Sequence, residues 1–169
     1  RRPQARIEHK KGHAFLFIRG THLNVHDLFQ DARLKMSNAE HPLEGRVHSG
    51  FHALYKNMRP ALVEAIDKLS IRNLTIVGVS MGAAISLMLA IYLKKTRPNL
   101  TVNLITALMP PVGNEQFMQT AHELEQQTHF IAKRNIVSTI HLKKSANDTM
   151  LRHAARTLLR MLGYSPLVI

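Results

Sequence analysis

The sequence predicts one α/β domain with a mostly parallel central sheet and helices on both of its faces. Short apolar runs bounded by Gly, Pro or Asn alternate along the chain with longer stretches whose apolar residues recur every three or four positions. The apolar runs are continuous, which is typical of strands that are buried on both faces of a parallel sheet. The length of 169 residues suits a single domain with one core.

The amino-terminal part begins with a polar and basic stretch, residues 1–13, which we expect to be a tail or a frayed edge that precedes a domain over residues 14–169. The run AFLFIRG, Ala14–Gly20, predicts the first buried strand. Residues His22–Leu34 place Leu23, Leu28, Phe29 and Leu34 among polar residues and predict a short amphipathic helix or a flap. The segment Ser37–Gly45 contains Pro and Gly and predicts a loop.

The middle of the chain predicts two helices around a second strand. Apolar residues recur at helical spacing over Gly50–Leu69, with Pro60 as an expected kink or restart. The run NLTIVGVS, Asn73–Ser80, predicts a buried strand, and Met81–Lys95 predicts the helix that follows it.

The carboxyl-terminal part continues the same alternation. Leu100–Leu108 predicts a third strand and Gly113–Gln127 a third helix. Thr128–Leu142 predicts one or two further strands, and Asp148–Leu162 predicts an amphipathic helix with apolar and arginine-bearing faces.

The charge of the chain favours an anionic partner. The formal net charge is +12, from 23 Lys and Arg against 11 Asp and Glu. The excess is concentrated near the end of the chain. Residues 126–169 contain one acid, Asp148, and seven basic residues: Lys133, Arg134, Lys143, Lys144, Arg152, Arg156 and Arg160. An acidic protein, a nucleic acid or an anionic membrane surface would suit this basic C-terminal face, although no nucleic-acid-binding signature is present.

Cysteine and hydropathy limit the other functional classes. The chain has no cysteine, which excludes disulfides and thiolate metal sites and favours a reducing, intracellular compartment. No apolar run reaches the roughly 20 residues that span a bilayer, and the first residues lack a signal-peptide core, so we expect a soluble protein; a removed targeting segment stays the alternative. No cofactor and no metal are expected.

The strongest chemical motif is Gly78-Val79-Ser80-Met81-Gly82, which fits the GxSxG nucleophile elbow. In such an elbow a sharp turn between a strand and a helix exposes the serine hydroxyl, and small flanking residues let the backbone pack tightly. The predicted strand before Ser80 and helix after it supply the context that the motif requires. The alternative is that this small-residue turn serves only close packing.

Further motifs give the chain a family resemblance. In order along the sequence they are FIRGTH at 17–22, the pair Asp27 and Asp31, VHSGFHALY at 47–55, GVSMGAAISLMLA at 78–90 and PPVGNEQF at 110–117. Their order and spacing resemble the class 3 lipases of the α/β-hydrolase superfamily over residues 14–137 or so. The resemblance implies a compact version of the α/β-hydrolase fold and a serine hydrolase that cleaves the carboxylic esters of lipids.

The resemblance also implies roles for individual residues. Thr21, in the RGT segment, and the backbone N–H of Met81 would stabilise an oxyanion formed at Ser80. Residues His22–Leu34 fall where such lipases carry a lid, with a helix packed permanently on the core as the alternative. His48 resembles a structural, hydrogen-bonded position.

The triad partners depart from the family pattern. Asn135 stands where the family carries its triad aspartate, and an uncharged amide stabilises an imidazolium poorly. His153 is the first candidate for the catalytic histidine and His141 the second, while Asp148 is the possible substitute acid. An ordinary structural role is the alternative for both histidines.

Three functional hypotheses follow. The first is an active esterase or lipase that works through a Ser80 acyl-enzyme. The second is a catalytically impaired lipase-like protein that serves as a basic structural or binding subunit of a larger assembly, motivated by Asn135 and the net charge. The third is a protein that binds lipid surfaces without chemistry.

Overall fold

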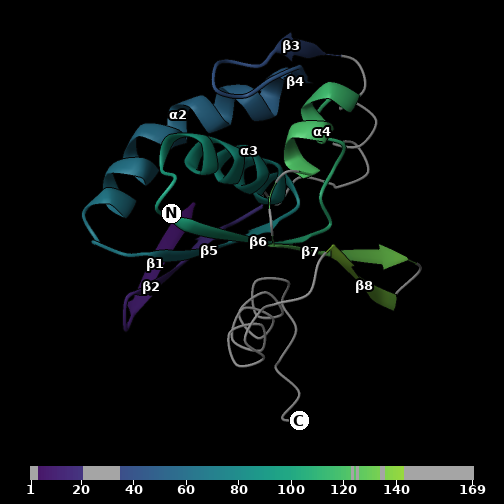
Figure 1. Cartoon of the computed structure of the whole chain (residues 1–169). Helices are drawn as coiled ribbons and strands as arrows, with labels where there is room; N and C mark the ends of the chain where they lie inside the picture. Colours follow the sequence, from purple (N-terminus) through teal and green to yellow (C-terminus); the bar gives the residue numbers. More distant parts are fainter. Residues whose placement is uncertain (1–3, 21–34, 123, 125, 134–135, 143–169) are drawn as a thin grey trace.

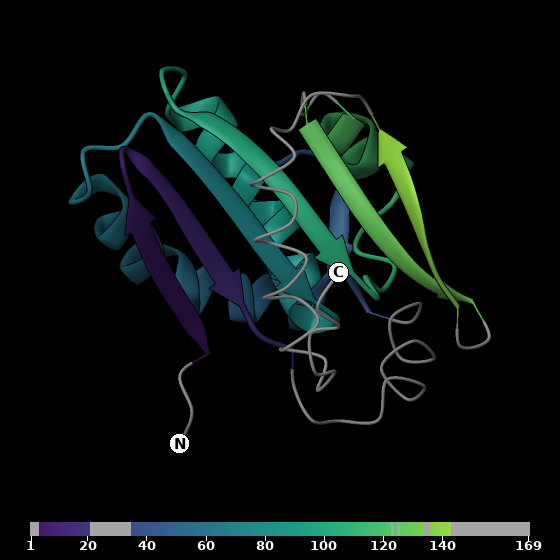
Figure 2. The ribbon, with the colours of Figure 1, turned by 90° about the horizontal axis from the view of Figure 1, so that it is seen from below.

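A twisted six-stranded sheet forms the centre of the computed structural model, which describes residues 4–20, 35–122, 124, 126–133 and 136–142. The strands of this sheet, in chain order, are β1 (Ala5–Lys10), β2 (His13–Ile18), β5 (Asn73–Val79), β6 (Thr101–Ala107), β7 (Gln126–Lys133) and β8 (Ile136–Leu142). They lie side by side in the order β1-β2-β5-β6-β7-β8 (Figure 2). The four inner strands are mutually parallel, and the two edge strands are antiparallel to their neighbours. The prediction of a mostly parallel central sheet is therefore confirmed.

The described helices cover one face of this sheet (Figure 1). They are α2 (Ser49–Asp67), α3 (Met81–Thr96) and α4 (Glu115–His122). A two-stranded ribbon, β3 (Met36–Asn38) paired with β4 (Arg46–His48), contacts α2, and β4 also contacts α4. None of the helices in the described ranges is long and apolar enough to cross a membrane.

The main core lies between the sheet and the helices. Helix α3 packs against β5, β6 and α2, so twelve of its sixteen residues are buried and it is apolar on almost every side. Its fully buried Leu87 and Leu89 belong to one cluster with Leu16 and Ile76 of the sheet. Each such side chain contributes about 1.5–3 kcal/mol when buried, so this layer holds the elements of the site in place.

A second, smaller cluster occupies the opposite face of the sheet. Phe17, Val77 and Ile105 alternate with core-facing residues along their strands, and all three are buried. Burial on both faces explains why the inner strands read as continuous apolar runs. The helix expected over Asp148–Leu162 lies outside the described residues.

The predicted basic tail over residues 1–13 is wrong for residues 5–10. They form β1, which pairs with β2 from Ala5 opposite Ile18 to Lys10 opposite His13. Ala5 and Ile7 pack against the core, while the charged Arg6 and Glu8 pair with each other at 3.0 Å. The alternation of apolar and polar residues over residues 5–10 is weak, because an edge strand buries few apolar side chains. The charged side chains of such a strand oppose pairing with other chains.

Three other boundaries differ from expectation. The loop predicted over Ser37–Gly45 includes the end of β3. The third helix is shorter than expected, because Gln126 and Gln127 belong to β7. Helix α2 runs without a restart through the exposed Pro60, whose missing N–H leaves a carbonyl on the solvent side of the helix.

Candidate active site

Ser80 occupies the sharp turn between β5 and α3, at the carboxyl end of the parallel strands. Its backbone N–H donates to the carbonyl of Ala107 at the end of β6, over 2.9 Å. Its backbone angles are φ 54° and ψ −124°, a combination that L-residues rarely adopt and that costs about 1–3 kcal/mol. Strain of this kind persists only where the surroundings enforce it, and it concentrates at functional sites.

Two glycines of the elbow motif enforce the turn by allowing close backbone contact. A Cβ on Gly78 would lie 2.6 Å from the carbonyl oxygen of Gly82 and 2.7 Å from the Cα of Ala83. A Cβ on Gly82 would lie 2.7 Å from the carbonyl oxygen of Arg19 and would also overlap that of Ile18. The start of α3 therefore packs directly on the end of β5 and on the chain that leaves β2.

A third glycine, which the sequence analysis did not single out, belongs to the same contact. Gly20 follows β2, and a Cβ there would lie 2.8 Å from the carbonyl oxygen of Val79 and 3.1 Å from the Cβ of Ser80. The segment that leads into Thr21 thus runs along the turn. The available signal was a glycine placed directly after an apolar strand.

The first turn of α3 presents backbone N–H groups at this site. The Ser80 carbonyl accepts from the N–H of Ala83 at 2.9 Å and more weakly from that of Ala84 at 3.4 Å. The N–H groups of Met81 and Gly82 precede these bonds and have no acceptor inside the helix. Together with the positive end of the helix dipole, these N–H groups can stabilise negative charge at this end of α3.

The Ser80 hydroxyl is not engaged by the helix. A serine at an N-cap normally accepts a bond from the second or third helical N–H, whereas Ser80 makes no such side-chain bond. The residue is 6% exposed. The turn therefore holds the hydroxyl in an enclosed position without using it as a cap.

The structure brings together only part of the predicted site. Ser80 and Met81 are adjacent at the turn, and Gly20 places the chain before Thr21 against them. Thr21, Asn135, Asp148 and His153 lie outside the described residues. His141 lies on β8 opposite Thr128 of β7.

The histidines with described side-chain bonds are used elsewhere. His13 lies at the amino end of β2 and bonds the Thr75 hydroxyl at 2.9 Å, and burial lowers its pKa. His48 and His52 lie at the start of α2, where they bond Phe51 and Ser37. Within the part of the chain that the structure describes, no histidine bonds Ser80.

Comparison with known proteins decides the family. The model of the class 3 lipase family matches residues 15–144, which is more than half of the chain. The chain belongs to the class 3 lipase family. No curated protein matches this lipase-family chain significantly.

Solved fungal lipases share its fold. Lipase II from Rhizopus niveus superimposes with a TM-score of 0.61 at 22% identity, over 73% of this chain and 49% of that protein. The triacylglyceride lipase of Rhizomucor miehei gives a TM-score of 0.61 at 17% identity, over 87% of this chain and 70% of that protein. The nonglycosylated LIP2 lipase of Yarrowia lipolytica gives 0.52 at 26% identity, over 67% and 42%. The chain thus spans about half the length of the first of these lipases and has their α/β-hydrolase fold.

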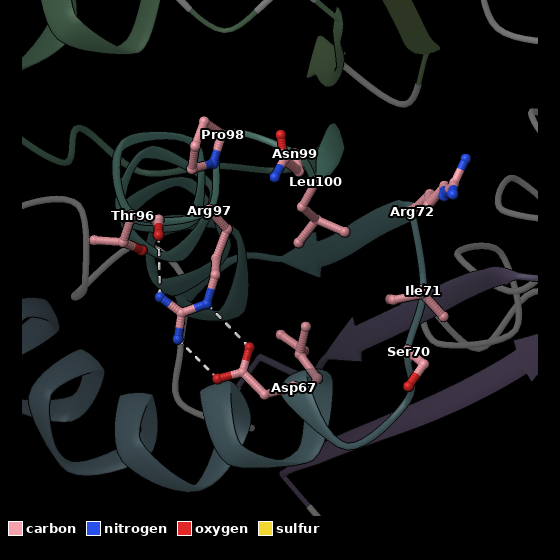
Figure 3. Close-up of a pocket in the computed structure, with 10 residues that line it drawn as sticks. Asp67, Ser70, Ile71, Arg72, Thr96, Arg97, Pro98, Asn99 and Leu100 are labelled. Atoms are coloured by element: carbon pink, nitrogen blue, oxygen red, sulfur yellow. Dashed lines mark hydrogen bonds and ion pairs between the residues drawn. The ribbon is translucent and has the colours of Figure 1, made fainter.

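The described part of this lipase-family chain also has a pocket that lies away from Ser80. It has a volume of about 670 Å³ and is lined by residues that precede β5 and β6 (Figure 3). Ser80 follows the other end of β5. Its Asp67 carboxylate is held by two bonds from Arg97, at 3.0 and 2.7 Å, and this bonding lowers the pKa of Asp67. Open α/β sheets bind substrates at the carboxyl ends of their strands, the end at which Ser80 lies and this pocket does not. The described residues also contain no cluster of His, Cys, Asp and Glu that could hold a metal ion.

Proposed function

We propose that this chain is a carboxylic ester hydrolase acting on lipid esters, with Ser80 as its nucleophile. The observation that carries the proposal is the backbone of Ser80, held at φ 54° between β5 and α3 in a turn whose close backbone contacts involve Gly20, Gly78 and Gly82. If the turn served packing alone, glycine would fit position 80 better than serine, because glycine adopts positive φ without strain. A hydroxyl kept there in spite of the strain suits a nucleophile elbow.

The first step is attack by the Ser80 Oγ on the ester carbonyl carbon. The carbonyl oxygen becomes a tetrahedral oxyanion, which accepts hydrogen bonds from the Met81 N–H and from Thr21. Collapse of this intermediate expels the alcohol and leaves an acyl group on Ser80. Water then attacks the acyl-enzyme, releases the fatty acid and restores the hydroxyl.

A histidine must accept the Ser80 proton and pass it to the departing alcohol. His153 is our first candidate and His141 the second. Asn135 would hold the imidazole by hydrogen bonding but would lend it no charge, and Asp148 is the possible substitute acid. Asn135 would be the weakest member of the triad, because an amide stabilises the imidazolium less than a carboxylate does.

Asparagine at position 135 also supports a second candidate function. A lipase-like fold with impaired turnover would act as a basic structural or binding subunit, and a net charge of +12 would favour docking on an acidic protein, a nucleic acid or an anionic membrane. The two candidates agree on the elbow and differ on the proton transfer that follows it.

A fluorophosphonate probe tests the nucleophile. We expect it to label the folded protein at Ser80 and to leave Ser80→Ala unlabelled. Ser86→Ala is the matched control: Ser86 lies six residues further along the chain in α3, is fully buried, and its loss should leave labelling intact. If the probe labels neither the folded wild-type protein nor the folded Ser86→Ala variant, the proposal is overturned.

Ester turnover then separates the two candidates. Hydrolysis of p-nitrophenyl esters that disappears in Ser80→Ala and persists in Ser86→Ala supports the enzyme. Labelling at Ser80 without multiple turnover supports the impaired subunit.

A further inference from the structure

Two histidines join the β3–β4 ribbon to the start of helix α2. His48 ends β4 and pairs with Met36 of β3, and its ring caps α2. His52, one turn into α2, has its Nδ1 3.3 Å from the Ser37 hydroxyl of β3. Both contacts lie outside the Ser80 turn, and neither is used by the proposed reaction.

The cap at His48 requires an uncharged ring nitrogen. The Phe51 N–H donates to the His48 Nδ1 over 3.3 Å, and an N-cap normally uses a side-chain oxygen that stays an acceptor at every pH. An imidazolium has no lone pair on Nδ1, so its protonation leaves the Phe51 N–H without this partner. The new positive charge would also lie at the positive end of the α2 dipole.

His52 is enclosed and has no acceptor for a second N–H. It is 6% exposed, and its Nε2 is buried with no hydrogen-bond partner. An imidazolium donates from both nitrogens, so charging the ring would bury an N–H that lacks an acceptor. Burial is the main cause that lowers the pKa of His52; the cations Lys56 and Arg59 lower it further, and Glu40 works against them.

We propose that His48 and His52 form a proton-sensitive attachment, which holds the ribbon on α2 when both rings are neutral and loosens it when they are protonated. The charged groups that act on His52 are Lys56, Arg59 and Glu40, and Glu40 pairs with Lys56 at 3.4 Å and with Arg59 at 3.5 Å. The other charged and titratable residues on the surrounding elements are Lys35, His41, Glu44, Arg46, Tyr55, Glu64, Asp67, Glu115 and His122. Three of the carboxylates among them are already paired: Glu44 with Lys95, Glu64 with Lys68 and Asp67 with Arg97. The surroundings thus supply little compensation for two further positive charges.

The attachment reaches the loop that leaves the carboxyl end of β6. The His48 N–H donates to the Val112 carbonyl at 2.8 Å, and Val47 forms a β-bridge with Gly113. Ser80 contacts the other end of this loop through Ala107. Loosening of the ribbon in acid therefore frees a segment that begins next to the nucleophile turn.

Hydrogen exchange followed by NMR at about pH 7.5 and about pH 5 tests the proposal in the whole chain. The reporters are the amides of Ala39, His48 and Phe51, and the reference is Ile76 in β5. After correction for intrinsic exchange, we expect protection of the three reporters to fall at least about tenfold in acid, and that of Ile76 to fall less. Parallel loss at Ile76 would mean global unfolding and would overturn the proposal.

Variants separate the two histidines from other titrating groups. In His48→Asn/His52→Leu, position 48 keeps an acceptor at every pH and position 52 has no proton to gain, so we expect protection to become independent of pH. His41→Gln, at an exposed position between the two ribbon strands, should keep the wild-type response. A response that survives in the double variant contradicts the proposal.

A measurement on the unaltered chain serves where the double variant folds poorly. The imidazole ring signals of His52 should titrate over the same pH range in which the Ala39 amide loses protection. Titration of His52 without any change at Ala39 would equally contradict the proposal.

Discussion

Gly20 and Ser80 are in such close contact that a Cβ on residue 20 would lie 3.1 Å from the Ser80 Cβ. The two residues are 60 positions apart in the sequence and leave neighbouring parallel strands, β2 and β5. The contact fixes the turn from outside the elbow motif itself. It also places Gly20, the described glycine of the RGT segment, beside the proposed nucleophile.

Gly20→Ala should therefore impair both stability and reactivity. The added methyl group meets the Val79 carbonyl oxygen at 2.8 Å, a backbone atom that moves only with β5, so we expect a loss of about 1–3 kcal/mol in the free energy of unfolding. Urea unfolding measures the loss, and fluorophosphonate labelling of Ser80 should slow in the folded fraction. Gly12→Ala is the comparison: it has open space around it and only the backbone cost of φ +75°, about 1 kcal/mol, and it should label normally.

Ser86→Ala should leave stability unchanged or raise it. The Ser86 hydroxyl is fully buried and forms no hydrogen bond, so its removal relieves a desolvated polar group. We expect a change between zero and about +1 kcal/mol in the free energy of unfolding, measured by thermal denaturation. Destabilisation by more than about 1 kcal/mol would show that the hydroxyl has a partner in solution.

Asp67→Asn should destabilise the far end of the fold modestly, in a way that depends on pH and salt. Bonding from Arg97 lowers the pKa of Asp67 in the folded state, so the pair contributes fully above the unfolded carboxyl pKa of about 3.9 and is lost as pH falls through the lower folded value. Because both side chains are more than a third exposed, we expect only about 0.2–1 kcal/mol at neutral pH. Urea unfolding at low and high salt checks this, with Glu64→Gln, which breaks the exposed pair with Lys68, as the control that should cost less.

Asn135→Asp should raise turnover if the chain is a lipase with a weakened triad. The reverse change in a serine protease costs about 10⁴ in kcat, which sets an upper limit for the gain. Hydrolysis of p-nitrophenyl esters measures it, and the gain should vanish in Ser80→Ala. Asn99→Asp adds the same charge at the opposite end of the sheet and should have no effect. Unchanged turnover in Asn135→Asp would exclude residue 135 as the triad position.

Most of the fold could be predicted because continuous apolar runs, such as Asn73–Val79, have few alternatives to a buried strand. The strand β1 was missed for the opposite reason: an edge strand buries little, so Ile7 is its only large apolar residue. The early end of α4 was missed because the glutamines that begin β7 suit a helix as well as a strand.

Within the site, residues that form a local sequence motif could be predicted. Residues whose role depends on contacts between distant parts of the sequence could not. The elbow follows from five adjacent residues, and the strained backbone of Ser80 agrees with it. Gly20 was not recognised because its role depends on Val79 and Ser80, which reach it only through strand pairing. The expected structural, hydrogen-bonded role of His48 agrees with its bond from the Phe51 N–H, although its use as a helix cap depends on the direction of its ring.

Substitutions in the strained turn should affect the amount of folded protein differently at the glycines and at Ser80. At Gly78, Gly82 and Gly20, a side chain meets backbone atoms, so replacements would reduce the amount of folded protein. At Ser80 the least strained residue is glycine, so its replacement would spare or increase folded protein while removing the hydroxyl. A survey of variants that measures both the amount of folded protein and the activity would therefore separate Ser80 from the three glycines: replacement of Ser80 would remove activity without loss of folded protein, whereas replacement of a glycine would reduce the folded protein itself.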